Sequence, residues 1–217
     1  MLRQSLRQIR IALLSVLAFT LGFGLVFPLG FTALARVLFP RQAAGSLITR
    51  GGRVIGSRLI AQGFTGAGYF HPRPSAAGAG YDAGYSGGTN LGPSSDKLIN
   101  GIHNKLPNGQ DDPGNFDGIG DLAAAYRREN GLPPGAPVPA DAVTRSASGL
   151  DPDISPANAE LQIPRVATAR GLSPGAVRGL VHAHMQARQL GLLGEPRINV
   201  LELNLALDDA SHAPSRP

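Results

Sequence analysis

The sequence predicts an α+β protein, in which a single N-terminal transmembrane helix is followed by one extracytoplasmic α+β domain. A long apolar run lies near the N-terminus, and the rest of the 217 residues shows both helix-type and strand-type patterns. That remainder has room for one domain of ordinary size. We expect a cytoplasmic tail at 1–10, the transmembrane helix at 11–35, the domain at 36–209 and a disordered tail at 210–217.

The membrane segment is defined by the absence of charge from Ile11 to Ala35. A helix of that length reaches roughly 37 Å, which exceeds a hydrocarbon core of about 30 Å. A cleaved signal peptide is the alternative, because three arginines precede the run and it ends on Ala-Leu-Ala. Signal peptides usually have a shorter apolar region, of about 7 to 15 residues, so a retained anchor is favoured.

Small side chains recur at helical spacing within this run, at Ala18, Thr20, Gly22 and Gly24. Such spacing lets a neighbouring helix approach closely, so these four residues are candidates for partner contact in the membrane. The alternative is that glycine and proline are simply common in transmembrane helices, with Pro28 doing no more than kinking this one.

Arginine counts on the two sides of the run do not decide its orientation, because three arginines precede it and three follow closely. A large following domain crosses a membrane largely regardless of its charge, whereas a short tail with three arginines and no acid favours the inside. We therefore expect the N-terminus inside and the domain outside.

The domain begins with a hairpin pattern, because apolar stretches at 46–49 and 54–57 flank Arg50-Gly51-Gly52-Arg53. Residues 63–93 are rich in glycine, proline and aromatics without a clear period, which predicts loops. Helices are expected from Ser95 to about His103 and from Asp121 to Glu129, with an exposed polar loop at 108–120 between them.

Two Ser-Pro pairs predict helix starts, because the hydroxyl caps the helix and proline fits its first turn. The first pair is Ser155-Pro156, with a helix toward Gly171; the second is Ser173-Pro174, with a helix ending at Gly191. Alternating leucines from Leu201 to Leu207 predict a half-buried strand.

Composition excludes several classes of protein. The formal charge is +5, but the arginines are dispersed and no aromatic residues interleave with them, so we expect no nucleic-acid binding. Cysteine is absent, which excludes disulfides and thiolate metal sites. No Gly-Lys pair occurs, so the chain lacks a phosphate-binding P-loop, and it also lacks an Asp-Lys-Thr-Gly phosphorylation signature.

We predict no catalytic residue and no metal site in this chain. Gly84-Tyr85-Ser86-Gly87-Gly88 matches the nucleophile elbow, so a membrane-tethered serine hydrolase using Ser86 is kept as an alternative. Glycine is frequent enough here to produce such a match by chance. Asn115, Asp117 and Asp121 imitate part of a calcium loop that lacks its first and last ligands.

Five ordered motifs point to a known family. They are Tyr-Phe-His-Pro-Arg-Pro-Ser-Ala at 69–76, Ser-Gly-Gly-Thr-Asn-Leu-Gly-Pro at 86–93, Val-Pro-Ala-Asp-Ala-Val-Thr at 138–144, Ser-Ala-Ser-Gly-Leu-Asp-Pro-Asp-Ile-Ser-Pro at 146–156, and Asn-Val-Leu with Leu-Asn at 199–204. Through these motifs nearly the whole chain resembles the KdpC family, the C subunit of the Kdp potassium-transporting ATPase. The departures are the Gly- and Asp-rich stretch at 108–120, which looks like an insertion, and Thr89 where serine is common.

The resemblance implies a non-catalytic accessory subunit in a bacterial inner-membrane complex, surrounded by membrane lipid. The implied partners are a KdpA-like channel subunit that carries potassium and a KdpB-like P-type ATPase subunit that hydrolyses ATP. Tyr69, Phe70, Arg73 and Asp151 are then candidates for partner contact.

The resemblance also implies a role as a catalytic chaperone that raises the ATP affinity of the pump, through a loop likened to the signature motif of ABC transporters. The candidate nucleotide residues are Ser86, Gly87, Gly88, Thr89 and Asn90. A domain outside the membrane cannot touch nucleotide on the cytoplasmic side. We therefore expect no firmly bound cofactor, an ATP association by resemblance only, and a structural, entrance-gating role.

Overall fold

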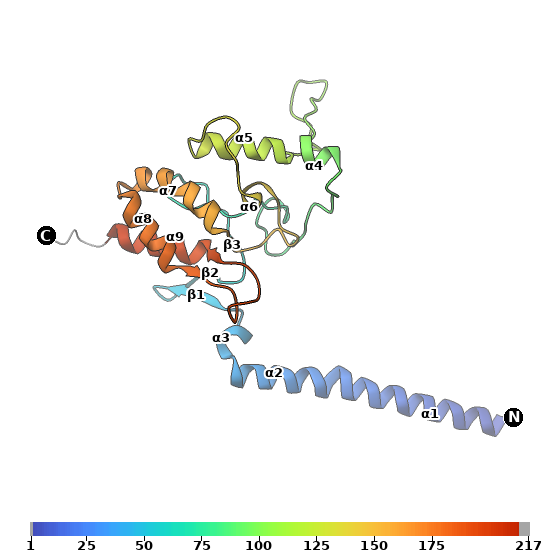
Figure 1. The fold of residues 1–217 in the computed structure, drawn as a ribbon. Coiled ribbons are helices and arrows are strands. Elements are labelled where there is room, and N and C mark those ends of the chain that lie inside the picture. The colour runs from blue at the N-terminus through green and yellow to red at the C-terminus, as the bar shows by residue number, and fades with distance from the viewer. Residues whose placement is uncertain (1, 213–217) are drawn as a thin grey trace. The chain divides into compact units, whose positions relative to one another are not determined.

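The computed structural model describes residues 2–212, with side chains from 4 to 211 (Figure 1). The chain divides into two compact units, with the division after Ile55. The first unit contains a long apolar helix and the second contains helices with a small antiparallel sheet. The α+β class and the single apolar N-terminal helix are therefore confirmed.

The first unit is dominated by one continuous helix, made of α1 (Leu2–Leu21), the π-helical turn η1 (Gly22–Val26) and α2 (Phe27–Leu38). Within the described residues this is the one helix long and apolar enough to cross a membrane, and the candidate span is Gln4–Leu38. It exceeds the predicted 11–35 because helical structure continues through the arginine-bearing turns on both sides. Where the hydrocarbon core begins and ends along it stays a prediction.

A widened turn precedes Pro28. The Phe27 amide donates to the carbonyl of Gly22, five residues back, instead of four. Proline has no amide hydrogen and its ring collides with the carbonyl four residues before it, so a wider turn relieves this conflict. Pro28 thus accompanies a π-helical turn at the candidate residues Gly22 and Gly24.

The predicted hairpin is confirmed. A short helix, α3 (Pro40–Ala43), leads to β1 (Leu47–Arg50) and β2 (Arg53–Ser57), which pair as a two-stranded sheet. Gly51 and Gly52 have φ values of 56° and 77°. Two consecutive positive φ angles give the turn whose twist matches that of the strands, and glycine adopts them at the least cost.

The second unit contains six helices and three short strands within its described residues. In chain order they are α4 (Asp96–Asn100), α5 (Ile119–Glu129), α6 (Ala140–Val143), β3 (Asp153–Ile154), α7 (Pro156–Arg170), α8 (Pro174–Ala183), β4 (Met185–Gln186), β5 (Arg197–Asn199) and α9 (Val200–His212). The strands form an antiparallel sheet in the order β3-β5-β4, in which Ile198 pairs with both Ile154 and Met185.

Both Ser-Pro starts are confirmed by their caps. The hydroxyl of Ser155 accepts a hydrogen bond from the Asn158 amide, and that of Ser173 accepts one from the Ala176 amide. Two predicted helix ends are wrong. The helix after Ser95 ends at Asn100, and α8 ends at Ala183 because the chain then pairs with β5 as a strand.

The strand predicted from Leu201 to Leu207 is wrong, because this segment belongs to the helix α9. Its most deeply buried apolar side chains are Val200, Leu203 and Leu207, spaced by three and four residues. That spacing marks one face of a helix, and the leucine alternation concealed it. The predicted disordered tail begins too early, because residues 210–212 are helical; residues 213–217 lie outside the described part.

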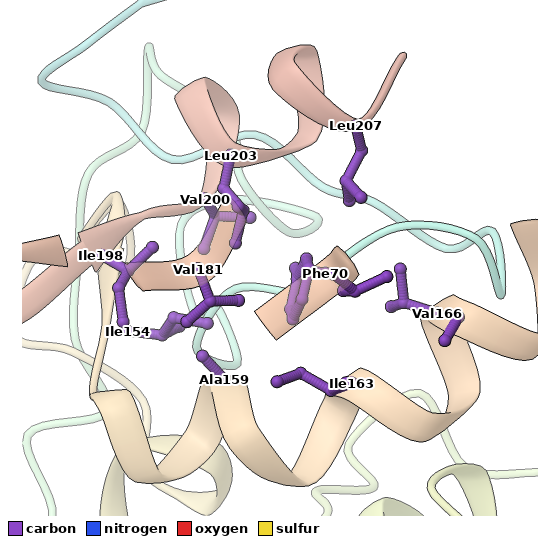
Figure 2. Close-up of a cluster of buried hydrophobic side chains, with 12 residues drawn as sticks. Phe70, Ile154, Ala159, Ile163, Val166, Val181, Ile198, Val200, Leu203 and Leu207 are labelled. Atoms are coloured by element: carbon purple, nitrogen blue, oxygen red, sulfur yellow. The ribbon is translucent and has the colours of Figure 1, made fainter. Parts of the chain in front are cut away.

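The main hydrophobic core lies between α7, α8, α9 and the sheet (Figure 2). Its fully buried side chains include Phe70, Ile163, Val166, Val177, Ile198, Leu203 and Leu207. Phe70 comes from a segment without helix or strand, and it lies among the side chains of the helices. A second, smaller cluster joins α5 and α6 through Tyr126, Ala142 and Val143. The loop that carries Phe70 is therefore held in position by packing against the helices.

Candidate functional site

Hydrogen bonds join the five motif segments to one another, although they are far apart in the sequence. The segment 69–76 contacts 138–144, 146–156 and 199–204, and the segment 86–93 contacts 146–156. We call these five segments the motif cluster. The sequence identified its members but not their mutual contacts.

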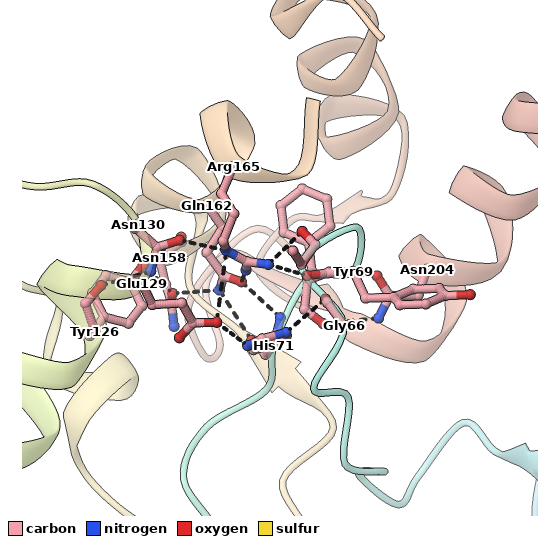
Figure 3. Close-up of polar contacts among 12 residues, drawn as sticks. Gly66, Tyr69, His71, Tyr126, Glu129, Asn130, Asn158, Gln162, Arg165 and Asn204 are labelled. Carbon is pink, nitrogen blue, oxygen red and sulfur yellow. Dashed lines mark hydrogen bonds and ion pairs between the residues drawn. The ribbon is translucent and has the colours of Figure 1, made fainter. Parts of the chain in front are cut away.

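Two buried amide side chains fix the backbone of the first motif (Figure 3). Asn204 accepts from the Phe70 amide at 2.8 Å and donates to the Phe70 carbonyl at 2.9 Å. Gln162 does the same for His71, at 2.7 and 3.1 Å. These pairings satisfy backbone groups that a strand would otherwise have paired, so α7 and α9 hold this loop as a sheet neighbour would.

His71 connects the loop to α5 (Figure 3). Its Nδ1 lies 2.5 Å from a carboxylate oxygen of Glu129, and its Nε2 lies 3.1 Å from the Gly66 carbonyl. Each ring nitrogen therefore faces an oxygen that accepts hydrogen bonds. The hydrogen bond from His71, followed by the charges of His71 and Arg165, holds the pKa of Glu129 below its ordinary value.

Arg165 extends this network from α7. Its guanidinium donates to the carbonyls of Ala67 and Tyr69, and to the side chains of Asn130 and Gln162. Burial lowers the pKa of this guanidinium from its ordinary value, and the neighbouring carboxylate of Glu129 opposes that shift. These hydrogen bonds therefore join α5, α7 and the loop in one polar network.

Arg73 and Asp151 form an ion pair at 2.8 Å, and both side chains are partly buried. The same guanidinium donates to the carbonyl and hydroxyl oxygens of Thr144. Three motif segments thus meet at Arg73. The Arg73–Asp151 pair is thus formed by contacts within the domain, without a partner chain.

Ser75 and Tyr81 secure the loop that follows. The Ser75 hydroxyl donates to the Gly149 carbonyl at 2.6 Å and accepts from the amides of Ala77 and Tyr81. The Tyr81 hydroxyl donates to the Arg73 carbonyl at 2.8 Å. Burial raises the pKa of Tyr81 to about 12, so this phenol remains a donor at neutral pH.

The Ser86 loop packs against residues 147–149. The Ser86 hydroxyl and the Gly87 amide both donate to the Ser148 carbonyl, at 3.0 and 2.9 Å. A Cβ at Gly88 would lie 2.8 Å from the Ala147 carbonyl oxygen, so glycine is required there by close approach. Asn90 has a φ of 52°, a left-handed conformation that asparagine tolerates better than most residues.

The geometry does not favour Ser86 as a nucleophile. A nucleophile elbow needs a strand before the serine and a helix after it. Neither is found here, because residues 58–95 run without helix or strand. The match at 84–88 therefore reflects the glycine content of the chain.

The partner-contact candidates differ in what they expose. Phe70 is fully buried, and its ring packs in the core of the domain. Tyr69 is half-buried, with its ring 5.4 Å from that of Phe64 and under the Arg170 guanidinium. Ala18, Thr20 and Gly24 are exposed along the apolar helix, and Gly22 is nearly so. The role of these residues in partner contact stays a prediction.

The partial calcium pattern takes another form in the structure. One ligand atom each from His103, Asp117 and Asp121 lies within 4.8 Å of the others, whereas Asn115 accepts from the Asn104 amide. Asp121 accepts from the Gly118 amide at 2.8 Å, which caps α5. This bond and the one with His103 lower the pKa of Asp121, and the cap accounts for the position of this carboxylate. His103 carried no signal in the sequence.

Taken with the fold, the motif cluster defines a class of protein: an α+β domain with an internally bonded loop surface, which follows the one candidate membrane span of the described residues in the sequence. A family profile described as KdpC, the c chain of the K⁺-transporting ATPase, matches residues 9–209. The chain therefore belongs to the KdpC family.

Curated relatives agree with this assignment. A potassium-transporting ATPase KdpC subunit from Rhodospirillum rubrum is 51% identical over 205 residues, covering 94% of this chain and 96% of the relative. The protein of the same description from Koribacter versatilis is 49% identical, covering 90% and 91%. That from Mycobacterium bovis is 50% identical, covering 93% and 98%. The similarity thus extends over both the apolar helix and the domain.

Proposed function

We propose that this chain is a non-catalytic accessory subunit of an ATP-driven potassium uptake complex, in which it stabilises assembly and supports transport. The observation that carries the proposal is the family match across residues 9–209, with relatives of about half identity that are named as subunits of a potassium-transporting ATPase. The matched residues include most of the apolar helix, so the helix is a feature that this chain shares with the family.

The partners we propose are a KdpA-like channel subunit and a KdpB-like P-type ATPase subunit, with ATP hydrolysis in the latter. The sequence supports this division of labour, because it has neither a P-loop nor a phosphorylation signature. The motif cluster supports it too, since its polar groups bond to one another and rigidify a surface. Such a prearranged surface suits docking, because little ordering is needed on binding.

We propose that the helix crosses the bacterial inner membrane with its N-terminus in the cytoplasm and the domain outside. Three arginines and no acid precede the apolar run, which favours retention of the tail inside. On this topology an effect on ATP affinity is a coupling between distant sites, transmitted through the complex. The Ser86 loop then acts as a structural part of the domain.

Topology is testable because the chain has no cysteine. Single cysteines are introduced at Gln4 and at the exposed Tyr85, and intact cells are treated with a maleimide that cannot cross membranes. We expect labelling of Tyr85→Cys in intact cells and of Gln4→Cys only after lysis. The reverse pattern contradicts the proposed orientation.

Function is tested by growth at limiting potassium in a strain whose own KdpC gene is deleted. The full chain should restore growth, and Ser86→Ala should restore it equally, because its hydroxyl makes a single bond to the Ser148 carbonyl. If wild type restores growth and Ser86→Ala does not, the serine hydrolase alternative gains support. If neither restores growth although both reach the membrane, the accessory role fails.

A further inference from the structure

A group of exposed leucines lies between β4 and β5. Leu190, Leu192 and Leu193 are 94%, 76% and 56% exposed, and they follow one another within residues 188–194, which we call the leucine tip. Single exposed leucines are common on protein surfaces, but adjacent ones form a patch that is unfavourable in water. The domain leaves this patch uncovered.

The leucine tip has a defined conformation. The amides of Gln189, Gly191, Leu192 and Leu193 all donate to carbonyls of residues within it. Leu190 has a φ of 53°, a left-handed conformation that is costly for a leucine. A strained backbone of this kind persists only where the surrounding structure holds it in place. The tip therefore presents its leucines outward from an ordered turn.

The chemistry of the tip fits lipid better than a protein partner. Arg188 is the one charged residue from 185 to 194, and residues 185–197 contain no aromatic side chain. Segments that lie on a membrane surface bury leucine side chains and keep arginine on their polar side, which matches the composition of the tip. Backbone amides that bond inside the turn carry a smaller desolvation cost into an apolar medium. At the base of the tip Glu195 is neutralised by Arg188, at 2.5 Å.

The connection between the candidate span and the second unit limits how far the domain can lie from a bilayer. The candidate span ends at Leu38 and the second unit begins at Gly56, so residues 39–55 connect them. Even fully extended, this connection reaches only about 56 Å. A tethered surface meets its ligand at a high effective concentration, so a weak apolar contact suffices.

We propose that the leucine tip inserts Leu190, Leu192 and Leu193 into the lipid surface beside the span, as a second membrane contact of the domain. The Arg188–Glu195 pair at its base fits the level of the lipid headgroups, where polar side chains remain solvated while the leucines are buried. This inference rests on the proposed span but not on the pump role.

The absence of tryptophan from the chain provides a clean test. Leu192→Trp places a single tryptophan on the tip of the full-length chain, Tyr85→Trp is a control at a site of matched exposure, 73%, and Phe23→Trp reports on the span. Each variant is reconstituted alone into vesicles of phosphatidylethanolamine and phosphatidylglycerol, with and without bromine on the acyl chains. Emission wavelength and quenching by bromine are measured.

We expect Leu192→Trp to emit at shorter wavelength than Tyr85→Trp and to lose emission in brominated vesicles, as Phe23→Trp does. Quenching of Phe23→Trp without quenching of Leu192→Trp overturns the proposal and leaves the span intact. Shielding of Leu192→Trp that requires co-reconstituted pump subunits also overturns it, because the occupant is then protein. Failure of the low-potassium growth test would instead contradict the proposed function alone.

Discussion

At the scale of single residues, the motif cluster is held together by specific contacts between side chains and backbone of different segments. Gly88 lies against the Ala147 carbonyl, Ser75 bridges to Gly149, and Arg73 joins Asp151 to Thr144. The sequence marked these residues as a family signature. Their roles depend on neighbours more than 50 residues away, which spacing along the chain cannot show.

Gly87 and Gly88 are neighbouring positions that together test the close packing of Gly88 against residue 147. A Cβ at Gly88 would collide with backbone at 2.8 Å, whereas nothing lies within 4 Å of a Cβ at Gly87. We expect Gly88→Ala to lower the free energy of unfolding by about 1–3 kcal/mol, the usual cost of overpacking. Gly87→Ala should change it little. Urea unfolding of the full chain in detergent, followed by circular dichroism, measures both, and equal losses would contradict the close approach.

Glu129 gives a prediction with a definite sign in pH. Its pKa is lowered from 4.5, first by the hydrogen bond from His71, so the carboxylate stabilises the fold above its unfolded pKa. That stabilisation is lost as pH falls from about 4.5 through the lower folded value. We expect Glu129→Gln to be less stable at neutral pH and to lose less stability on acidification.

Urea unfolding at a series of pH values between neutral and about 3 tests this prediction. The slope of the unfolding free energy against pH gives the difference in bound protons between the unfolded and folded states. His71→Gln should flatten the profile in the same way, since it removes the main cause of the shift. A Glu129→Gln profile that parallels wild type throughout would show that the network does not couple to stability.

At the scale of elements, the sequence predicts features that depend on neighbouring residues and does not predict those that depend on distant ones. Each Ser-Pro start is decided within four residues, and so is the Gly51-Gly52 turn, so the sequence predicted both. The strands of the sheet β3-β5-β4 have two or three residues each, which is too short for any periodicity, and β3 lies far from β5 in the chain. It was therefore not predicted.

The error at Leu201–Leu207 has a similar cause. Leucine favours helices intrinsically, and the buried positions 200, 203 and 207 also fit a helical face. Asn204, which alternation placed opposite the leucines, is buried with them because it bonds the Phe70 backbone. A buried polar residue thus disguised the helical period.

This leads to a prediction for Asn204. Its replacement by leucine leaves the Phe70 amide and carbonyl buried without these partners, which costs about 1–3 kcal/mol for each unsatisfied group. We expect Asn204→Leu to lower the free energy of unfolding by several times the effect of Asn108→Leu, at an exposed loop site. Denaturant unfolding of both variants compares them. Equal stability would mean that α9 does not hold the loop in place.

At the scale of the whole molecule, an apolar helix and a folded domain are joined in one chain, and both fall within the family match. The sequence predicted this arrangement because hydrophobic length is a strong local signal. Orientation carried no comparable signal, since arginines flank the span on both sides. The proposed function requires that the chain act as part of a membrane complex.

The most direct test of that claim is affinity purification of the tagged full chain, in mild detergent, from a bacterium that expresses all subunits of the potassium-transporting ATPase. We predict that two larger membrane proteins co-purify with it and that the preparation hydrolyses ATP in response to potassium. Recovery of the chain as a stable monomer, with those partners present in the same membranes, would contradict the account.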